Sequence, residues 1–241
     1  LTPIMVYSDM AISRLSPTDP LVSDLKQILN GAFRAKKLVQ QILTFSRQIE
    51  QERKPVRFSI LIKEAIQFMR SLMPATIEIR LLIDSSCDTI MADASQIHQV
   101  IVNLCTNAYH SMEDMGGTLT IRLKQVKVDA ETIEFHPYLE EREYVRLTVS
   151  DTGIGMNDYT IERSFDPFFT TKPVDKGNGL GLSVVHGIVR SHYGDIIVNS
   201  EPGEGSSFHV YIPLYNATYS ETEIMEDKTV QCGKESTFTR R

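Results

Sequence analysis

Two glycine clusters stand out in this chain: DTGIGM at residues 151–156 and GNGLGL at residues 177–182, with SFDPFFTTK between them. Glycine accepts positive φ and lets backbone amides approach a ligand without an intervening side chain, as phosphate oxygens require. Asp151 ends the apolar run YVRLTVS and is placed to accept a hydrogen bond from the exocyclic amine of a purine. One glycine turn alone is weak evidence, because such turns connect elements in most domains. The pair together indicates a nucleotide cradle.

A third feature is the stretch QIHQVIVNLCTNAYHSM at residues 96–112, whose apolar residues recur at helical spacing. Asn103 and Asn107 lie on the same side of this predicted helix, and His110 lies one turn beyond Asn107. An amide oxygen can ligate Mg²⁺ while waters and phosphate oxygens complete the octahedron. The alternative is that both asparagines only hydrogen-bond the backbone.

Taken in order, these motifs resemble the ATP-binding domain of sensor histidine kinases. That domain belongs to a larger ATPase superfamily with gyrase, the mismatch-repair protein MutL and the ninety-kilodalton heat-shock chaperone. The resemblance covers about residues 56–214 and rests on the asparagine helix, DTGIGM, DPFFTTK, GNGLGL and GEGSSFHVYIPL. It implies a two-layer α/β sandwich, with ATP and Mg²⁺ as cofactors.

The resemblance also implies roles for individual residues. Asn107 would ligate Mg²⁺, and Asn103 would support the phosphates and the metal from the previous turn. Asp151 would accept the adenine amine, with Gly153 and Gly155 shaping the floor of the base pocket. The phosphates would lie at the amino terminus of a helix over residues 180–194, where backbone amides and the helix dipole favour anions. The implied residues there are Gly177, Gly179, Leu180, Gly181 and Leu182.

A mobile lid is implied between the two glycine clusters. Phe165, Phe168 and Phe169 would anchor it by packing, and Phe168 and Thr171 are counted among the nucleotide-binding residues. Lys172 is the cation expected for a phosphate oxygen and joins Asn103 and Asn107 as the predicted catalytic set, although a solvated lysine fits the sequence equally well. His110 stands where many family members have lysine, which leaves its role at the phosphates open.

The resemblance also helps to distinguish ATP hydrolysis from phosphoryl transfer to a protein side chain. Superfamily members that hydrolyse ATP share a glutamate one helical turn before the asparagine that binds the metal. There the glutamate can activate water as a general base. This chain has Asn103 there, and an amide cannot accept that proton. The resemblance therefore implies a histidine kinase that transfers the γ-phosphoryl to a histidine and thence to a response-regulator aspartate. The alternative is an ATP-binding conformational or interaction module, such as a degenerate kinase or a chaperone- or gyrase-like ATPase.

Residues 1–53 are similar to the dimerisation and phosphotransfer hairpin of the same family. Apolar residues recur every seven positions at Leu21, Ile28, Ala35, Ile42 and Ile49, as in the seam of a helical bundle. The connector SPTDP predicts two antiparallel helices, with Asp19 starting the second. The histidines occupy positions 98, 110, 136, 186, 192 and 209. No phosphoacceptor histidine is therefore expected in this chain, and we predict it just upstream of residue 1, in a longer parent protein.

These observations predict an α+β chain in three parts. Residues 1–53 form a helical hairpin that makes a four-helix bundle as a homodimer, residues 54–215 form the ATP-binding domain, and residues 216–241 are a polar linker or disordered tail. A response-regulator receiver domain is the expected partner, in trans or following the tail in a hybrid kinase. The ATP-binding domain should contain helices at 59–73, 96–112 and 180–194 and a mixed sheet covered on one face.

Composition and charge argue against several other classes of protein. The net charge of −6 and the pI of about 5.6 argue against nucleic-acid binding. No apolar run approaches the roughly 20 residues of a membrane span, so no membrane contact is expected. Three cysteines without metal-ligand spacing indicate reduced thiols and a cytoplasmic location, with Cys105 in the core, while a longer parent protein could still be tethered to a membrane.

Overall fold

The computed structural model describes residues 2–16, 19–32, 53–84, 88–129, 139–172 and 179–215. Its contacts divide the chain into two units, residues 1–51 and 52–241, and each is described by itself. The predictions made for Ala35, Ile42, Ile49, Gly177 and the tail at 216–241 fall outside the described residues.

The described part of the first unit is mainly helical. Helix α1 spans Thr2–Arg14, and residues 20–32 are helical as well. Asp19 precedes the second helical segment, and its Oδ1 accepts a hydrogen bond from the backbone amide of Leu21 at 2.9 Å. The predicted start signal is confirmed, because a side-chain acceptor at this position satisfies one of the amides that a helix leaves unpaired.

The second unit is built on a five-stranded mixed sheet with the strand order β2-β4-β5-β7-β6. Its strands are β2 (Ile77–Ile83), β4 (Gly117–Lys127), β5 (Glu143–Asp151), β6 (Asp195–Glu201) and β7 (Gly205–Pro213). Strands β2 and β4 are parallel, and every other neighbouring pair is antiparallel. The predicted mixed sheet is confirmed.

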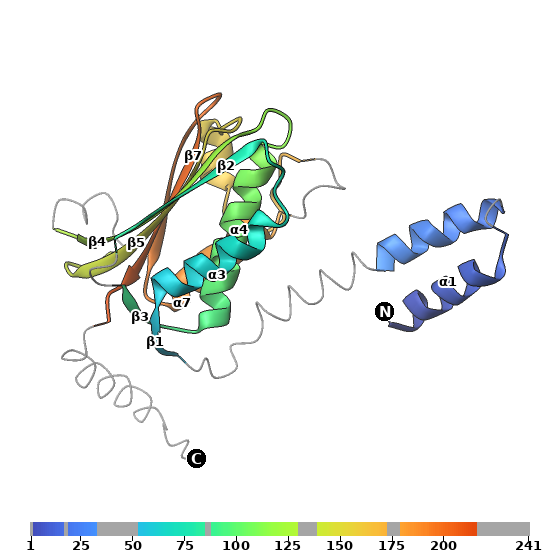
Figure 1. Cartoon of the computed structure of the whole chain (residues 1–241), viewed down its shortest axis with the longest axis horizontal. Coiled ribbons are helices and arrows are strands. Elements are labelled where there is room, and N and C mark those ends of the chain that lie inside the picture. The colour runs from blue at the N-terminus through green and yellow to red at the C-terminus, as the bar shows by residue number, and fades with distance from the viewer. Residues whose placement is uncertain are drawn as a thin grey trace, which may run out of the picture. The chain divides into compact units, whose positions relative to one another are not determined.

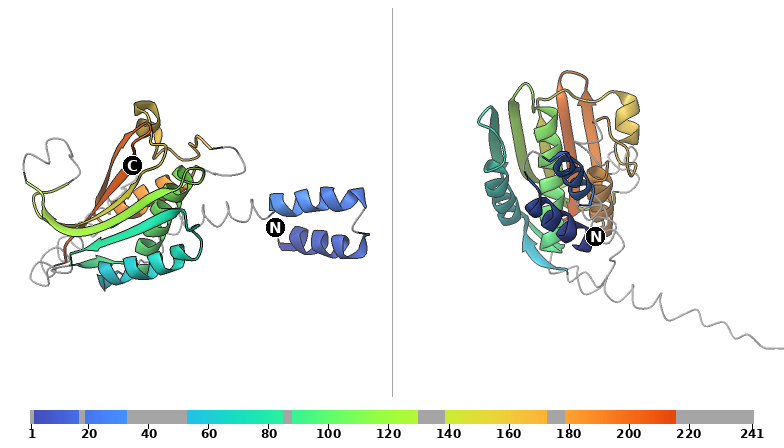
Figure 2. Two further views of the ribbon diagram at one scale, coloured as in Figure 1. Left: turned by 45° about the horizontal axis from the view of Figure 1, so that its top comes forward. Right: turned by 90° about the vertical axis from the view of Figure 1, so that its right-hand side faces the viewer.

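Helices cover one face of this sheet (Figure 1). They are α3 (Phe58–Arg70), α4 (Ala94–Ser111) and α7 (Gly181–Ser191), and their apolar sides form a single core with the sheet. In β5 the alternating residues Val145, Leu147 and Val149 point into that core, as the period of a strand requires. Figure 2 shows the same two layers from two further sides. The expected two-layer arrangement is therefore present.

Cys105 lies in this core, as predicted. It is fully buried on α4, and burial raises the pKa of its thiol to about 12. A thiol in that state is protonated at neutral pH and is chemically inert.

Several short elements were not predicted. Strands β1 (Lys54–Arg57) and β3 (Thr89–Ala92) pair with each other in a separate two-stranded sheet, and α6 (Asp158–Arg163) follows the first glycine cluster. Four residues are too few for an alternating pattern to be recognised in a sequence. The helix predicted at 59–73 ends earlier, at Arg70, because the amides of Ser71 and Leu72 bond to carbonyls three residues back.

Candidate functional site

Helix α4 presents the two asparagines. Asp93 caps the helix, accepting hydrogen bonds from the amides of Ser95 at 2.9 Å and Gln96 at 3.3 Å. Apolar residues at helical spacing bury one side of α4 in the core, including Val100, Ile101, Leu104 and Ala108. Asn103 and Asn107 consequently lie on the half-buried side of the helix.

Both asparagines lie beside the first residue of α7. Asn103 Nδ2 is 3.4 Å from the carbonyl oxygen of Gly181 and donates to it. A Cβ added to Gly181 would lie 3.9 Å from Asn107 Nδ2, so the glycine leaves open space next to that amide. The structure thus brings the asparagine helix and the second glycine cluster together. Leu180, which precedes α7, provides no side-chain cap for the helix amides.

Asp151 is the last residue of β5, and its side chain is buried. Its Oδ1 accepts hydrogen bonds from Ser111 Oγ at 2.8 Å and from the amide of Gly153 at 2.9 Å. Burial raises the pKa of Asp151, against the opposing effect of hydrogen bonds from Ser111, Gly153 and Ser206. The result is a buried, firmly oriented acceptor at the end of a central strand.

The first glycine cluster is closely packed. A Cβ on Gly153 would overlap Ser111, and a Cβ on Gly155 would overlap the carbonyl of Glu201. Gly155 also has a φ of 66°, in the left-handed region that side chains disfavour. The turn is therefore pressed against the end of α4 on one side and the β6–β7 hairpin on the other.

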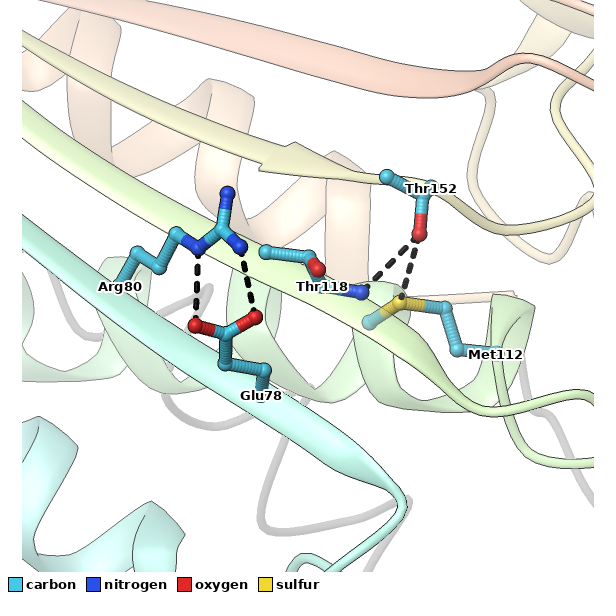
Figure 3. A network of polar contacts seen from close by, with 5 residues as sticks. All are labelled: Glu78, Arg80, Met112, Thr118 and Thr152. Carbon is cyan, nitrogen blue, oxygen red and sulfur yellow. Dashed lines mark hydrogen bonds and ion pairs between the residues drawn. The ribbon is translucent and has the colours of Figure 1, made fainter.

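Thr152 links this turn to two further elements (Figure 3). Its Oγ1 accepts a hydrogen bond from the amide of Thr118 on β4 at 3.0 Å and lies 3.9 Å from Met112 Sδ at the end of α4. On the neighbouring strand β2, Arg80 pairs with Glu78 through two bonds of 2.9 and 2.8 Å. Sequence reasoning gave no role to Thr152, because nothing in the pattern shows which strand faces it.

The phenylalanines of the predicted lid behave differently from one another. Phe165 packs against the core, with its ring 5.5 Å from that of His186. Phe169 packs edge-on against Tyr159 at 6.2 Å, and the guanidinium of Arg163 lies 4.6 Å from its centroid. Packing by these two residues is confirmed.

The prediction that Phe168 anchors the lid by packing is wrong. Its side chain is 63% exposed, and its φ is 67°. The amide of Phe168 donates to the carbonyl of Gly179 at 2.9 Å, and a Cβ on Gly179 would overlap the backbone of Phe168. This close backbone approach fixes a left-handed turn at Phe168, and its ring remains exposed.

A small charged group lies near the end of α4. Lys172 is half-buried and not fully solvated. This burial lowers the pKa of Lys172, and the negative charge of Glu113 opposes that shift. His110 Nδ1 is 3.9 Å from Glu113 Oε2, and its ring lies 5.2 Å from that of Tyr109. Thr171 is exposed. Glu113 is a residue that sequence reasoning missed, since it belongs to none of the recognised motifs.

The remaining predicted residues are Leu180, which is buried, and Leu182, which packs against the core. Within the described ranges, no group of three His, Cys, Asp or Glu side chains could hold a metal ion. None of the helices in those ranges is long and apolar enough to cross a bilayer.

Comparisons with known proteins agree with this geometry. Residues 92–216 match the model of the histidine kinase-, DNA gyrase B-, and HSP90-like ATPase family. Sensor kinase CckA of Brucella abortus is 37% identical over 219 residues, covering 88% of this chain and 22% of CckA. Signal transduction histidine-protein kinase AtoS of Escherichia coli is 29% identical over 216 residues, covering 89% of this chain and 32% of AtoS. The chain thus spans a third or less of the length of these relatives.

A solved structure shows the same architecture. Full-length ShkA, solved in complex with AMPPNP, superposes with a TM-score of 0.67 at 26% identity, covering 90% of this chain and 44% of ShkA. The buried aspartate, the paired asparagines and the glycines beside them are all contained in the part of the chain that the family model matches. The chain belongs to the family of histidine kinase-, DNA gyrase B- and HSP90-like ATPases, and its ATPase domain is similar to the corresponding part of sensor histidine kinases.

Proposed function

We propose that this chain is the catalytic core of a two-component sensor histidine kinase that binds MgATP and donates its γ-phosphoryl to a histidine. The observation that supports this best is the meeting of Asn103 and Asn107 with Gly181 at the amino terminus of α7. Backbone amides at a helix amino terminus favour phosphate, and side-chain amides beside them can bind a cation or a phosphate oxygen.

The base would be recognised at Asp151. A carboxylate can accept a hydrogen bond from the exocyclic amine of adenine. Guanine has a carbonyl oxygen at the same position, and this oxygen has no hydrogen to donate. The hydrogen bonds from Ser111 and Gly153 fix the orientation of this acceptor. Gly153 and Gly155 would bound the pocket with backbone only, which lets the flat base approach closely.

The residues present fit a Mg²⁺ site in which the ion is held mainly by the phosphates of the substrate. Asn107 would supply one amide oxygen, and a Cβ on Gly181 would come no closer than 3.9 Å to the nitrogen of the same amide. Mg²⁺ commonly keeps several waters and binds through one or two protein ligands plus phosphates, so a site without a cluster of carboxylates suits it. When bound, Mg²⁺ would neutralise charge on the phosphates.

Asn103 determines which nucleophile is used. Its amide donates to the carbonyl of Gly181 and has no basic group that could take a proton from water. We therefore propose that an imidazole nitrogen forms the new bond to the γ-phosphorus with its lone pair. The bond from phosphorus to the bridging oxygen breaks, ADP leaves with that electron pair, and the other imidazole nitrogen releases its proton.

The acceptor is proposed to be a histidine of the dimerisation helix outside this sequence, because residues 1–53 contain no histidine. The phosphoryl group would pass from there to the aspartate of a response-regulator receiver domain. The solved structure of histidine kinase ThkA contains the response regulator protein TrrA in complex, and its fold matches this chain with a TM-score of 0.63. A receiver domain is accordingly the proposed partner.

Calorimetric titration with a non-hydrolysable ATP analogue and Mg²⁺ tests the site. We expect Asn107→Ala to weaken binding in the presence of Mg²⁺ by about tenfold, the typical effect of losing one hydrogen bond or ligand contact to a charged group. Asn199→Ala is the matched control, because Asn199 is an exposed asparagine on β6. Equal affinity of the Asn107 variant and the wild type would contradict the assignment of Asn107 to the nucleotide site.

Labelling tests the reaction itself. A longer chain that includes the predicted upstream histidine should acquire an acid-labile label from γ-labelled ATP, and replacing that histidine with Gln should abolish the label. Label that survives the replacement would place the acceptor elsewhere.

A further inference from the structure

Ser111 is the last residue of α4, and it contacts the base-recognition turn in three ways. Its Oγ is 2.8 Å from Asp151 Oδ1, and its carbonyl oxygen accepts a hydrogen bond from the amide of Ile154 at 3.2 Å. Gly153 lies so close that a Cβ there would overlap the serine side chain. A single serine thus contacts three of the four residues from 151 to 154.

The hydroxyl of Ser111 has two competing acceptors. Its Oγ lies 2.8 Å from the carbonyl oxygen of Ala108 and 2.8 Å from Asp151 Oδ1. A serine hydroxyl carries one proton, and a hydrogen bond to an ionised acceptor is about twice as strong as a neutral one. While Asp151 is ionised, the proton is therefore donated to the carboxylate.

Two of the hydrogen bonds to Asp151 fall on the same oxygen. Ser111 Oγ and the amide of Gly153 both donate to Oδ1, which fixes the carboxyl group from two directions. A carboxylate has about four acceptor positions, so it keeps the capacity to receive a base amine. The orientation of the carboxyl group depends on the serine, because Ser111 is the side-chain donor to it and the other donors are the backbone amides of Gly153 and Ser206.

We propose that Ser111 is a positioning residue for nucleotide recognition: it holds the Asp151 carboxylate, and through Ile154 the whole turn, in the orientation that accepts the adenine amine. The inference rests on the proposed function for the identity of the ligand. The contact between Ser111 and Asp151 does not depend on which ligand binds. It also connects base recognition to the helix that carries Asn103 and Asn107, since Ser111 ends that helix.

Electrostatics supports this role. Burial raises the pKa of Asp151, and the hydrogen bond from Ser111 opposes that rise more than the bonds from Gly153 and Ser206 do. Without the hydroxyl, the carboxyl group would keep its proton to a higher pH. A protonated carboxyl is a weaker acceptor, so base binding would then be lost at a higher pH during acidification.

The first experiment measures Asp151 directly, without nucleotide. The carboxyl carbon of Asp151 is titrated by NMR in the wild-type chain, Ser111→Ala and Ser111→Thr. We expect a raised pKa in the alanine variant and a value near wild type in the threonine variant, which retains the hydroxyl. Ser71→Ala is the matched control, because Ser71 Oγ also donates to a carbonyl three residues back, at 2.7 Å, at the end of a helix without an aspartate partner. An unchanged titration in Ser111→Ala would overturn the proposal.

The second experiment measures affinity for a non-hydrolysable ATP analogue between about pH 5 and pH 8. Ser111→Ala should bind about threefold to tenfold more weakly, which is less than the full value of a charge-assisted hydrogen bond because Ser111 acts on the base only through Asp151, and the difference should widen as the pH falls. A loss that is the same at every pH would indicate a merely structural serine and overturn the proposal. If Ser111→Ala does not fold, Ser111→Cys replaces it, since a thiol is a weaker donor of similar size.

The two experiments separate the two levels of inference. If the wild-type chain does not bind the analogue, the proposed function fails, and the NMR titration alone then decides whether Ser111 controls Asp151. If the analogue binds and Asp151→Asn binds equally well, the carboxylate is not the base acceptor and the role of Ser111 in recognition is lost as well.

Discussion

At the scale of single residues, the site contains polar groups whose environment defines what they can do. Asp151 is a buried carboxylate that would accept a base amine, and Asn103 is an amide where a hydrolytic ATPase would need a base. Under the proposed function, the first residue would favour nucleotide binding and the second would disfavour attack by water. Binding without rapid hydrolysis is what a phosphoryl donor requires.

The position of Asn103 leads to a prediction. Asn103→Glu places a potential general base one helical turn before Asn107, so slow ATP hydrolysis should increase by about tenfold to a hundredfold, at or below the lower end of typical general-base contributions. Release of inorganic phosphate measures this rate. Asn103→Ala is the control, since it removes the amide without adding a base and should show no increase. Equal rates in the two variants would mean that position 103 does not reach the attacking water.

At the scale of elements, helices α4 and α7 are held to each other at the ends away from the proposed nucleotide site. His192 follows α7, and its Nε2 accepts a hydrogen bond from the amide of Asp93 at 3.2 Å. Its Nδ1 donates to the carbonyl of Ile188 at 2.8 Å, which specifies the neutral tautomer. Burial lowers the pKa of His192, in agreement with that state. The two helices that present Asn107 and Gly181 thus share a buried link.

Asp93 contributes to the same link by capping α4. Burial alone would raise its pKa, but hydrogen bonds from Ser95 and Gln96 outweigh it, and the pKa is lowered overall. A lowered pKa in the folded state means that ionised Asp93 stabilises the fold above the pKa of the unfolded chain. That stabilisation is lost as the pH falls through the folded pKa.

We therefore expect Asp93→Ala to lower the free energy of unfolding by about 1 kcal/mol at neutral pH, a typical value for a lost cap. The difference from wild type should shrink as the pH falls below 3.8, the ordinary pKa of an aspartate side chain. Chemical denaturation at several pH values measures both effects. A difference that does not change with pH would show that the charge of Asp93 is unimportant. Asp158→Ala is a suitable control, because Asp158 lies in the first turn of the short helix α6.

At the scale of the whole molecule, the helical first unit exposes apolar side chains that a partner would cover. Leu21 is 56% exposed and Ile28 is 51% exposed, and the two are seven residues apart. A heptad repeat places such residues on one side of a helix, where they pack against another helix in a bundle. The exposure is consistent with the homodimer predicted from the sequence, which we propose for this chain.

This proposal predicts that Ile28→Asp makes the chain monomeric at micromolar concentration, because a charge would be buried at the centre of the bundle. Sedimentation velocity measures the change. Ile60→Asp is the matched control, since Ile60 is 46% exposed on α3 in the second unit and should leave the dimer intact. A wild-type chain that is already monomeric would contradict the proposed dimer.

Much of the second unit could be predicted because its elements have long, regular patterns. Helices α3, α4 and α7 and the strands of the large sheet all follow clear apolar periods. The four-residue strands β1 and β3 were missed because they are too short to show one. Ser111, Thr152 and Glu113 were missed for another reason, since their contacts are made with residues distant in the sequence.

The sequence by itself determined the order of the motifs, the family, the acidic residue at the end of a strand and the asparagine that replaces a general base. These are properties of residue type and local spacing. The tertiary structure decided which groups meet: Ser111 with Asp151, 40 residues apart, and Asn103 with Gly181, 78 residues apart. It also decided that the ring of Phe168 is exposed. Such contacts depend on how α4 and α7 pack across the sheet, and no local pattern of residues encodes that packing.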